Sequence, residues 1–71
     1  MAKALDKKTS EPVGIAAAIA GNCEPCLKFH FSQAKKAGCK REEVKEVIKI
    51  ARMVKDSPIQ IIYKLADKLV G

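Results

Sequence analysis

The sequence predicts an all-α domain, a short bundle of about four helices that assembles with further copies through apolar helix faces. Three observations lead to this prediction. Nearly half of the residues are hydrophobic, yet only Phe29, Phe31 and Tyr63 are aromatic, and such mixtures favour helices packed on helices. No segment alternates with the period of a strand. A chain of 71 residues buries only about 60–65% of its unfolded surface, so self-association often adds stability.

The first helix is expected to begin at Thr9-Ser10-Glu11-Pro12, where a hydroxyl cap precedes an acid and a proline. Residues 1–8 are polar and charged, and we expect them to be a flexible segment ahead of a single domain over residues 9–71. The helix then runs to about Ala20 without a polar face, which indicates burial on all sides at a subunit interface. Gly14 costs about 1 kcal/mol relative to Ala there, unless close packing requires it.

The second helix follows after a short turn. Gly21 is a natural helix stop and Asn22 a natural N-cap. Pro25 suits the first turn, because its missing N–H has no partner there in any helix. The helix continues to Ala37, and Gly38 ends it.

Two further helices are expected in the remaining sequence. The third begins near Arg41 and carries an apolar stripe at helical spacing, formed by Val44, Val47, Ile48, Ala51 and Val54. Asp56-Ser57-Pro58 reads as a helix end followed by a new N-cap and first turn. The fourth helix then carries its own stripe to the end of the chain, formed by Ile59, Ile62, Leu65, Ala66, Leu69 and Val70.

The clearest chemical signal is a C-x-x-C-x-x-x-H motif formed by Cys23, Cys26 and His30, the only histidine. On a helix, residues three and four positions apart lie on one face. Two sulfurs that can form a disulfide would therefore lie beside a group that exchanges a proton near neutral pH. The motif thus favours redox chemistry.

A thiol reacts as its thiolate, and two features of the motif would favour that form. Both cysteines are expected in the first turn of a helix, where free N–H groups and the helix dipole stabilise an anion. His30 could take or relay a proton. The second thiol could condense with a sulfenic acid before further oxidation, and an external thiol would then reduce the disulfide. On helix position alone, Cys23 is the more acidic thiol.

The same residues allow two other interpretations. Cys23, Cys26, His30 and Cys39 offer the donor set of a four-coordinate zinc site, and the motif could also be incidental. A zinc site is disfavoured because Cys39 follows the helix end, near 20 Å from Cys23 at a rise of about 1.5 Å per residue. A non-catalytic zinc-binding or helical interaction module is therefore the alternative to an enzyme.

The sequence resembles the carboxymuconolactone decarboxylase and alkylhydroperoxidase-D-like family over about residues 10–58. The resemblance rests on Cys23, Cys26 and His30, on Glu11 twelve residues before Cys23, and on the segments that follow. Those segments are Ala34-Lys35-Lys36-Ala37-Gly38 and the acidic helix start Glu42-Glu43 with its apolar continuation. The family's redox members share this order of a glutamate, an Ala-rich run, a Gly before CxxC, the His and a Gly turn.

The resemblance implies an alkylhydroperoxidase-D-like helical fold in trimers or hexamers, and peroxide reduction through a dithiol. It implies that Cys26 forms the sulfenic acid, that Cys23 is proton donor and resolving thiol, and that His30 and Glu11 form the proton relay. The partners would be a peroxide or disulfide substrate and an external thiol reductant, without a metal or other cofactor. The decarboxylases of the family generally lack the dithiol, so decarboxylation is disfavoured.

Charge and cysteine usage bound the remaining possibilities. The formal net charge is +6, but the basic residues are scattered and no aromatic platform accompanies them, so we expect no nucleic-acid partner. A basic DNA-binding helical protein is nonetheless a hypothesis that a salt titration can dismiss. The sequence shows no secretory signal, and its longest uncharged run, Pro12 to Cys23, is too short to span a bilayer. We therefore expect a cytoplasmic protein without a membrane partner, where a close cysteine pair is more often catalytic than structural.

Overall fold

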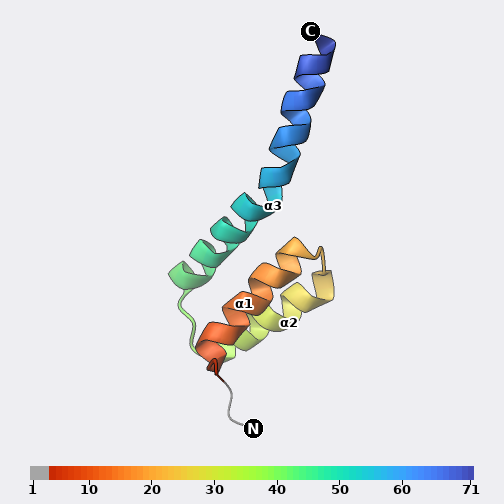
Figure 1. The fold of residues 1–71 in the computed structure, drawn as a ribbon. Coiled ribbons are helices and arrows are strands. Elements are labelled where there is room, and N and C mark those ends of the chain that lie inside the picture. Colours follow the sequence, from red (N-terminus) through yellow and green to blue (C-terminus); the bar gives the residue numbers. More distant parts are fainter. Residues whose placement is uncertain (1–3) are drawn as a thin grey trace.

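The computed structural model describes residues 4–71 and contains three α-helices and no strand over that range (Figure 1). Helix α1 spans Lys7–Ala20, α2 spans Glu24–Lys36 and α3 spans Arg41–Val70. The expected all-α class is confirmed. The expected flexible segment over residues 1–8 falls partly on residues 1–3, which lie outside the described residues, whereas Lys7 and Lys8 belong to α1.

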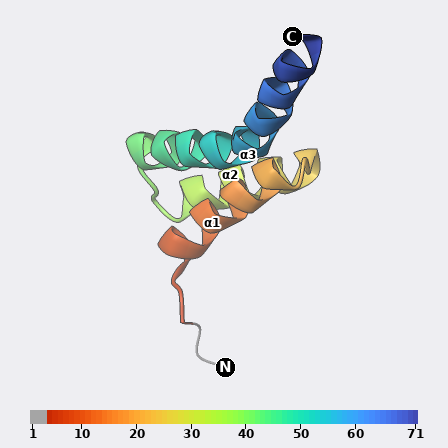
Figure 2. The ribbon, with the colours of Figure 1, turned by 45° about the horizontal axis from the view of Figure 1, so that its top comes forward.

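The prediction of about four helices is wrong, because α3 continues through Asp56-Ser57-Pro58. A proline inside a helix removes one i→i−4 hydrogen bond and displaces the carbonyl of residue i−4, here Val54. Val54 is 63% exposed, so water can hydrogen-bond the carbonyl that the proline leaves without a donor. Figure 2 shows that α3 changes direction partway along, which is the usual response to an internal proline.

Helix α1 begins earlier than Thr9-Ser10-Glu11-Pro12 predicted. Asp6 is its N-cap, and the Asp6 carboxylate accepts a hydrogen bond of 2.9 Å from the Thr9 N–H. Pro12 therefore lies inside the helix, where it cannot donate to the Lys8 carbonyl. The thiol of Cys39 lies 3.5 Å from that carbonyl and donates to it instead. The cost of the internal proline is thus partly offset by a contact from the α2–α3 loop.

Helix α1 lies between the other two helices and contacts both, whereas α2 and α3 share no such packing. The described core is formed by Ile15, Ala18, Ala34, Val44 and Ala51. Ile15 and Ala34 are fully buried, and Ile15 is the one large side chain that is fully enclosed. Helices α2 and α3 cover only part of the apolar surface of α1, because Val13 is 56% exposed and Ala17 and Ala20 are exposed as well. The expectation that a second subunit covers the rest of α1 stays a prediction.

The turn between α1 and α2 positions the cysteine motif. Gly21 is the C-cap of α1, as predicted, and Asn22 adopts a left-handed conformation with φ of 55°. The expected N-cap at Asn22 is wrong, because Cys23 takes that position. Asparagine tolerates the left-handed region, so it serves the turn rather than the cap. The end of α2 is as predicted, with Gly38 at φ of 87° just after the helix.

Helix α3 consists of a packed first part and a projecting second part. Val44 and Ala51 are buried, and Val47 and Ile48 are partly buried against the core. The predicted stripe does not extend to Val54, which is 63% exposed. A 2.7 Å hydrogen bond from the Lys55 ammonium to the Ala20 carbonyl links α3 to the end of α1. None of the three helices is long and apolar enough to cross a membrane.

Candidate functional site

The two cysteines of the motif are joined by a disulfide at the start of α2, with their Cα atoms 5.2 Å apart. Cys23 is the N-cap, and its sulfur accepts a hydrogen bond of 3.3 Å from the Cys26 N–H. Pro25 occupies the first turn between them, as predicted. The expectation that both cysteines lie in the first turn is therefore corrected, since only Cys26 is inside the helix.

The disulfide lies at the surface of the molecule. Cys23 is partly buried and Cys26 is exposed. Thiol–disulfide exchange requires direct access of an attacking thiolate to a sulfur. The helix N-terminus, with its unpaired N–H groups, also stabilises an anion that develops on either sulfur. The arrangement can therefore be opened and closed by an external thiol without rearrangement of the core.

His30 and Glu11 form the second half of the site. The His30 Nδ1 lies 2.9 Å from a carboxylate oxygen of Glu11, although the residues are nineteen positions apart. The side chain of Glu11 is 13% exposed and that of His30 is 31% exposed. An ionised carboxylate can only accept, so Nδ1 is the donor in this hydrogen bond, and the Nε2 of a neutral ring is left as a base. Glu11 reaches the ring because it lies inside α1 rather than at its start.

Gly14 makes the approach of His30 possible. A Cβ atom at this position would lie 2.5 Å from the His30 Nδ1 and 2.6 Å from the ring Cγ, closer than real Cβ contacts. Gly14 is one turn beyond Glu11 on the same face of α1. The His30 ring therefore packs against Gly14, where no side chain blocks it, while Glu11 supplies the hydrogen bond. The close packing that would justify this glycine is thus present.

The role of Gly14 in the site was not predicted from the sequence. The available signal was a glycine within an otherwise Ala- and Ile-rich helix, three residues after the acid of the motif. Phe29 was also missed. Its ring meets the His30 ring edge to face, with centroids 5.1 Å apart and an interplanar angle of 79°. Phe29 is itself 56% exposed, so the paired rings lie near the surface.

The four donors of the zinc alternative are not gathered at one point. Cys39 lies beyond the other end of α2 and contacts the Lys8 carbonyl. Across residues 4–71, no group of three or more His, Cys, Asp or Glu side chains is arranged to hold a metal ion. The four predicted redox residues instead form two pairs, the Cys23–Cys26 disulfide and the His30–Glu11 hydrogen bond, which α2 connects through its first two turns.

Comparison with known proteins identifies a family for the chain. A model of the carboxymuconolactone decarboxylase family matches residues 1–61, which is well over half of the chain. The match extends from the region before α1 into the second half of α3, and so includes every residue of the two pairs. No curated protein and no solved structure matches the chain.

Proposed function

Because the chain belongs to the carboxymuconolactone decarboxylase family, we propose that it is a thiol-dependent redox enzyme that reduces peroxides. The observation that carries the proposal is the presence, on one helix, of a reducible cysteine pair and an imidazole held by a carboxylate. The catalytic residues would be Cys26, Cys23, His30 and Glu11. The family also includes decarboxylases, but a surface disulfide has no part in decarboxylation.

In the first step, the Cys26 thiolate attacks the terminal oxygen of a hydroperoxide. The O–O bond breaks, Cys26 becomes a sulfenic acid, and the leaving alkoxide takes a proton and departs as an alcohol. His30 accepts the proton of the Cys26 thiol at Nε2 as the thiolate forms and then gives it to the leaving alkoxide, while Nδ1 is held by the Glu11 carboxylate. His30 is one helical turn from Cys26, which suits this transfer.

In the second step, Cys23 attacks the sulfur of the Cys26 sulfenic acid. A disulfide forms and the hydroxyl leaves as water, giving the bonded pair seen in the structure. An external dithiol or two thiols then reduce the disulfide by exchange and are themselves oxidised. The balanced reaction converts one hydroperoxide and two thiols into an alcohol, water and one disulfide.

Disulfide reduction is the second candidate reaction. Cys23 is the N-cap, and its sulfur accepts the Cys26 N–H, which stabilises a thiolate on Cys23. A thiolate at this position could attack a substrate disulfide directly. The exposed position of Cys26 next to His30 favours peroxide reduction by Cys26, so the two reactions differ in which sulfur attacks first.

The proposal includes a homo-oligomer, a trimer or hexamer, in the cytoplasm. Apolar side chains are exposed along the second half of α3, with Ile61 at 70%, Ile62 at 55% and Leu65 at 50%. Exposed apolar surface of this extent typically marks an interface. A reducing compartment is the natural location of a dithiol that must be regenerated by another thiol.

The test compares peroxide consumption by the parent protein and three single variants. We expect Cys26→Ser to lose activity by about 100-fold or more, as expected for a lost nucleophile. Cys23→Ser should accumulate a sulfenic acid on Cys26 that a dimedone probe traps. Cys39→Ser is the matched control and should retain activity. If Cys26→Ser consumes peroxide as fast as the parent does, the proposal is wrong.

A further inference from the structure

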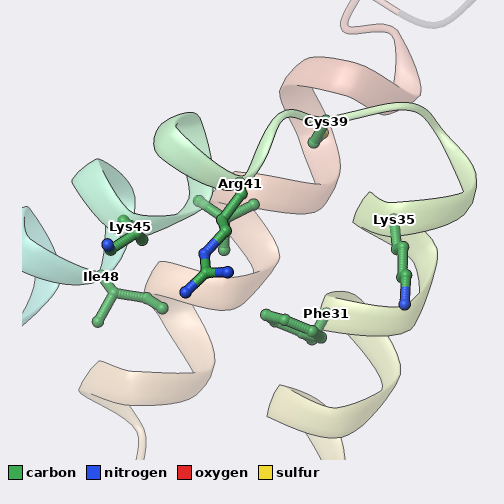
Figure 3. Close-up of a pocket in the computed structure, with 7 residues that line it drawn as sticks. Phe31, Lys35, Cys39, Arg41, Lys45 and Ile48 are labelled. Atoms are coloured by element: carbon green, nitrogen blue, oxygen red, sulfur yellow. The ribbon is translucent and has the colours of Figure 1, made fainter.

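A groove of about 560 Å³ opens between α2 and the first two turns of α3, away from the cysteine pair (Figure 3). Its walls combine cationic and apolar side chains from both helices, with one residue from the loop between them. These residues are Phe31, Lys35, Cys39, Arg41, Val44, Lys45 and Ile48. Its volume lies within the range of about 300–1,000 Å³ that small-molecule sites occupy.

The groove carries positive charge without a counter-charge. Lys35, Arg41 and Lys45 line it, and no acidic residue does. Among the described residues, ion pairs occur at Glu24 and Glu11 only, so these three cations have no acidic partner. Glu42 and Glu43 neighbour Arg41 in sequence but do not line the groove. The Glu43 carboxylate accepts a hydrogen bond of 2.9 Å from the Lys40 N–H.

The remaining wall of the groove is apolar. Phe31 is 49% exposed, although a large aromatic side chain is usually more buried. Val44 and Ile48 belong to the core and present part of their surface to the groove. Figure 3 shows Arg41 projecting into the space between α3 and α2, on the side where Phe31 and Lys35 lie. The Arg41 guanidinium thus lies at the edge of an apolar surface.

We propose that this groove binds a small organic carboxylate with an apolar body. The carboxylate pairs with the Arg41 guanidinium, which matches it in bidentate geometry, while Lys35 and Lys45 add positive potential. The apolar body covers Phe31, Val44 and Ile48. The site uses none of the four redox residues, so it is independent of the proposed peroxide reduction.

Both properties of the groove are needed for this assignment. An inorganic anion would leave the apolar wall in water, and a neutral lipid would leave three unpaired cations beside it. A second hollow of about 300 Å³ continues the groove along α3, sharing Lys45 and Ile48 and adding Lys49 and Arg52. The positive character therefore extends beyond the carboxylate position along α3.

The test measures binding of three probes of equal chain length to the full-length protein, by NMR of the Phe31 ring and the Val44 and Ile48 methyl groups. The probes are octanoate, octanol and octylammonium. We expect octanoate to shift these signals and to bind at least about tenfold more tightly than octanol, as charge-assisted hydrogen bonds require. Octylammonium should not bind. Equal affinity of octanoate and octanol would overturn the proposal.

Two variants locate the binding. Arg41→Gln should weaken octanoate binding by about tenfold, and Lys36→Gln is the matched control. Lys36 neighbours Lys35 on α2 but does not line the groove, so its variant should bind as the parent does. Three results would contradict the proposal. The first is that octanoate shifts the signals of residues 52–70 instead. The second is that the groove signals change on dilution without ligand, because a second copy of the chain fills the groove. The third is that duplex DNA displaces octanoate.

Discussion

The packed part of the chain, from Lys7 to Ala51, and the projecting part, from Arg52 to Val70, have similar apolar patterns but different surroundings. All the described buried residues lie in the first part. Every residue of the second part is exposed, including large apolar ones. Both parts are helical, and α3 belongs to both. An amphipathic pattern therefore establishes a helix, whereas burial depends on whether another helix lies within reach.

The redox site belongs entirely to the packed part. Glu11 and Gly14 on α1 hold the ring of His30 on α2, and the two cysteines lie at the N-terminus of α2. These positions depend on α1 packing against α2, and α3 supports α1 from its other side. The projecting part contributes no residue to this site. Its proposed contribution is assembly through exposed apolar side chains.

The largest effect on stability is expected from Ile15→Ala, and Ile62→Ala is the matched variant in the projecting part. Ile15 is fully buried, and its truncation should cost about 2–5 kcal/mol, a large share of the roughly 4–10 kcal/mol available to a domain of this size. Ile62 is 55% exposed, and its truncation should change the monomer's free energy of unfolding by less than about 0.5 kcal/mol. Urea unfolding at low protein concentration measures both. A concentration-dependent loss with Ile62→Ala would show burial of the projecting part in an assembly.

The second prediction concerns the packing of the His30 ring against Gly14. Gly14→Ala would place a Cβ within 2.8 Å of three ring atoms of His30. We expect a destabilisation of about 1–3 kcal/mol from overpacking, together with a loss of the His30–Glu11 hydrogen bond. The ¹⁵N shifts of the His30 ring report that bond. Gly21→Ala is the matched control, since its Cβ would approach only the Ala17 carbonyl, at 3.2 Å. Unchanged ring shifts in Gly14→Ala would contradict this account of the site.

The third prediction tests the bend in α3. Pro58→Ala restores a donor for the Val54 carbonyl, and in a helix interior Ala is favoured over Pro by about 3 kcal/mol. Because α3 is helical here even with the proline, we expect the free energy of local opening to rise by only about 1 kcal/mol. Amide hydrogen exchange between Val54 and Ile62 should therefore become slower. Exchange in α1 and α2 should not change. If the amides near Val54 exchange as before, the proline does not limit this part of α3.

The smallest effect is expected at the start of α1. Hydrogen bonds from Thr9, first from its side chain and then from its backbone N–H, lower the pKa of Asp6 below its ordinary value. A lowered pKa in the folded state means that the contribution to stability is present above the unfolded pKa and is lost as pH falls through the folded one. Helical circular dichroism should therefore decrease slightly below about pH 4. Asp6→Asn, which keeps a cap without the charge, should lack this decrease.

The sequence predicted the helical class and the end of α2, because each depends on local chemistry. The C-x-x-C-x-x-x-H motif came from spacing and Glu11 from the family resemblance, and their catalytic roles stay predictions. The prediction of separate third and fourth helices was wrong because capping residues around Pro58 resemble a helix boundary, while an exposed proline only bends a helix. The start of α1 was misplaced because Thr9 and Ser10 are good caps, as is Asp6, which precedes them. The pairing of Gly14 with His30 could not be predicted from spacing, since it depends on how α1 crosses α2.

The contact between Cys39 and the Lys8 carbonyl has a practical consequence for thiol chemistry on this protein. A reagent aimed at the cysteine pair will also reach a third sulfur, which is only partly buried and holds the loop after α2 against a backbone site opened by Pro12. A bulky adduct there would push this loop away from α1 and alter the helix that carries Glu11. Labelling studies are therefore cleaner on Cys39→Ser, whose hydroxyl can donate to the same carbonyl.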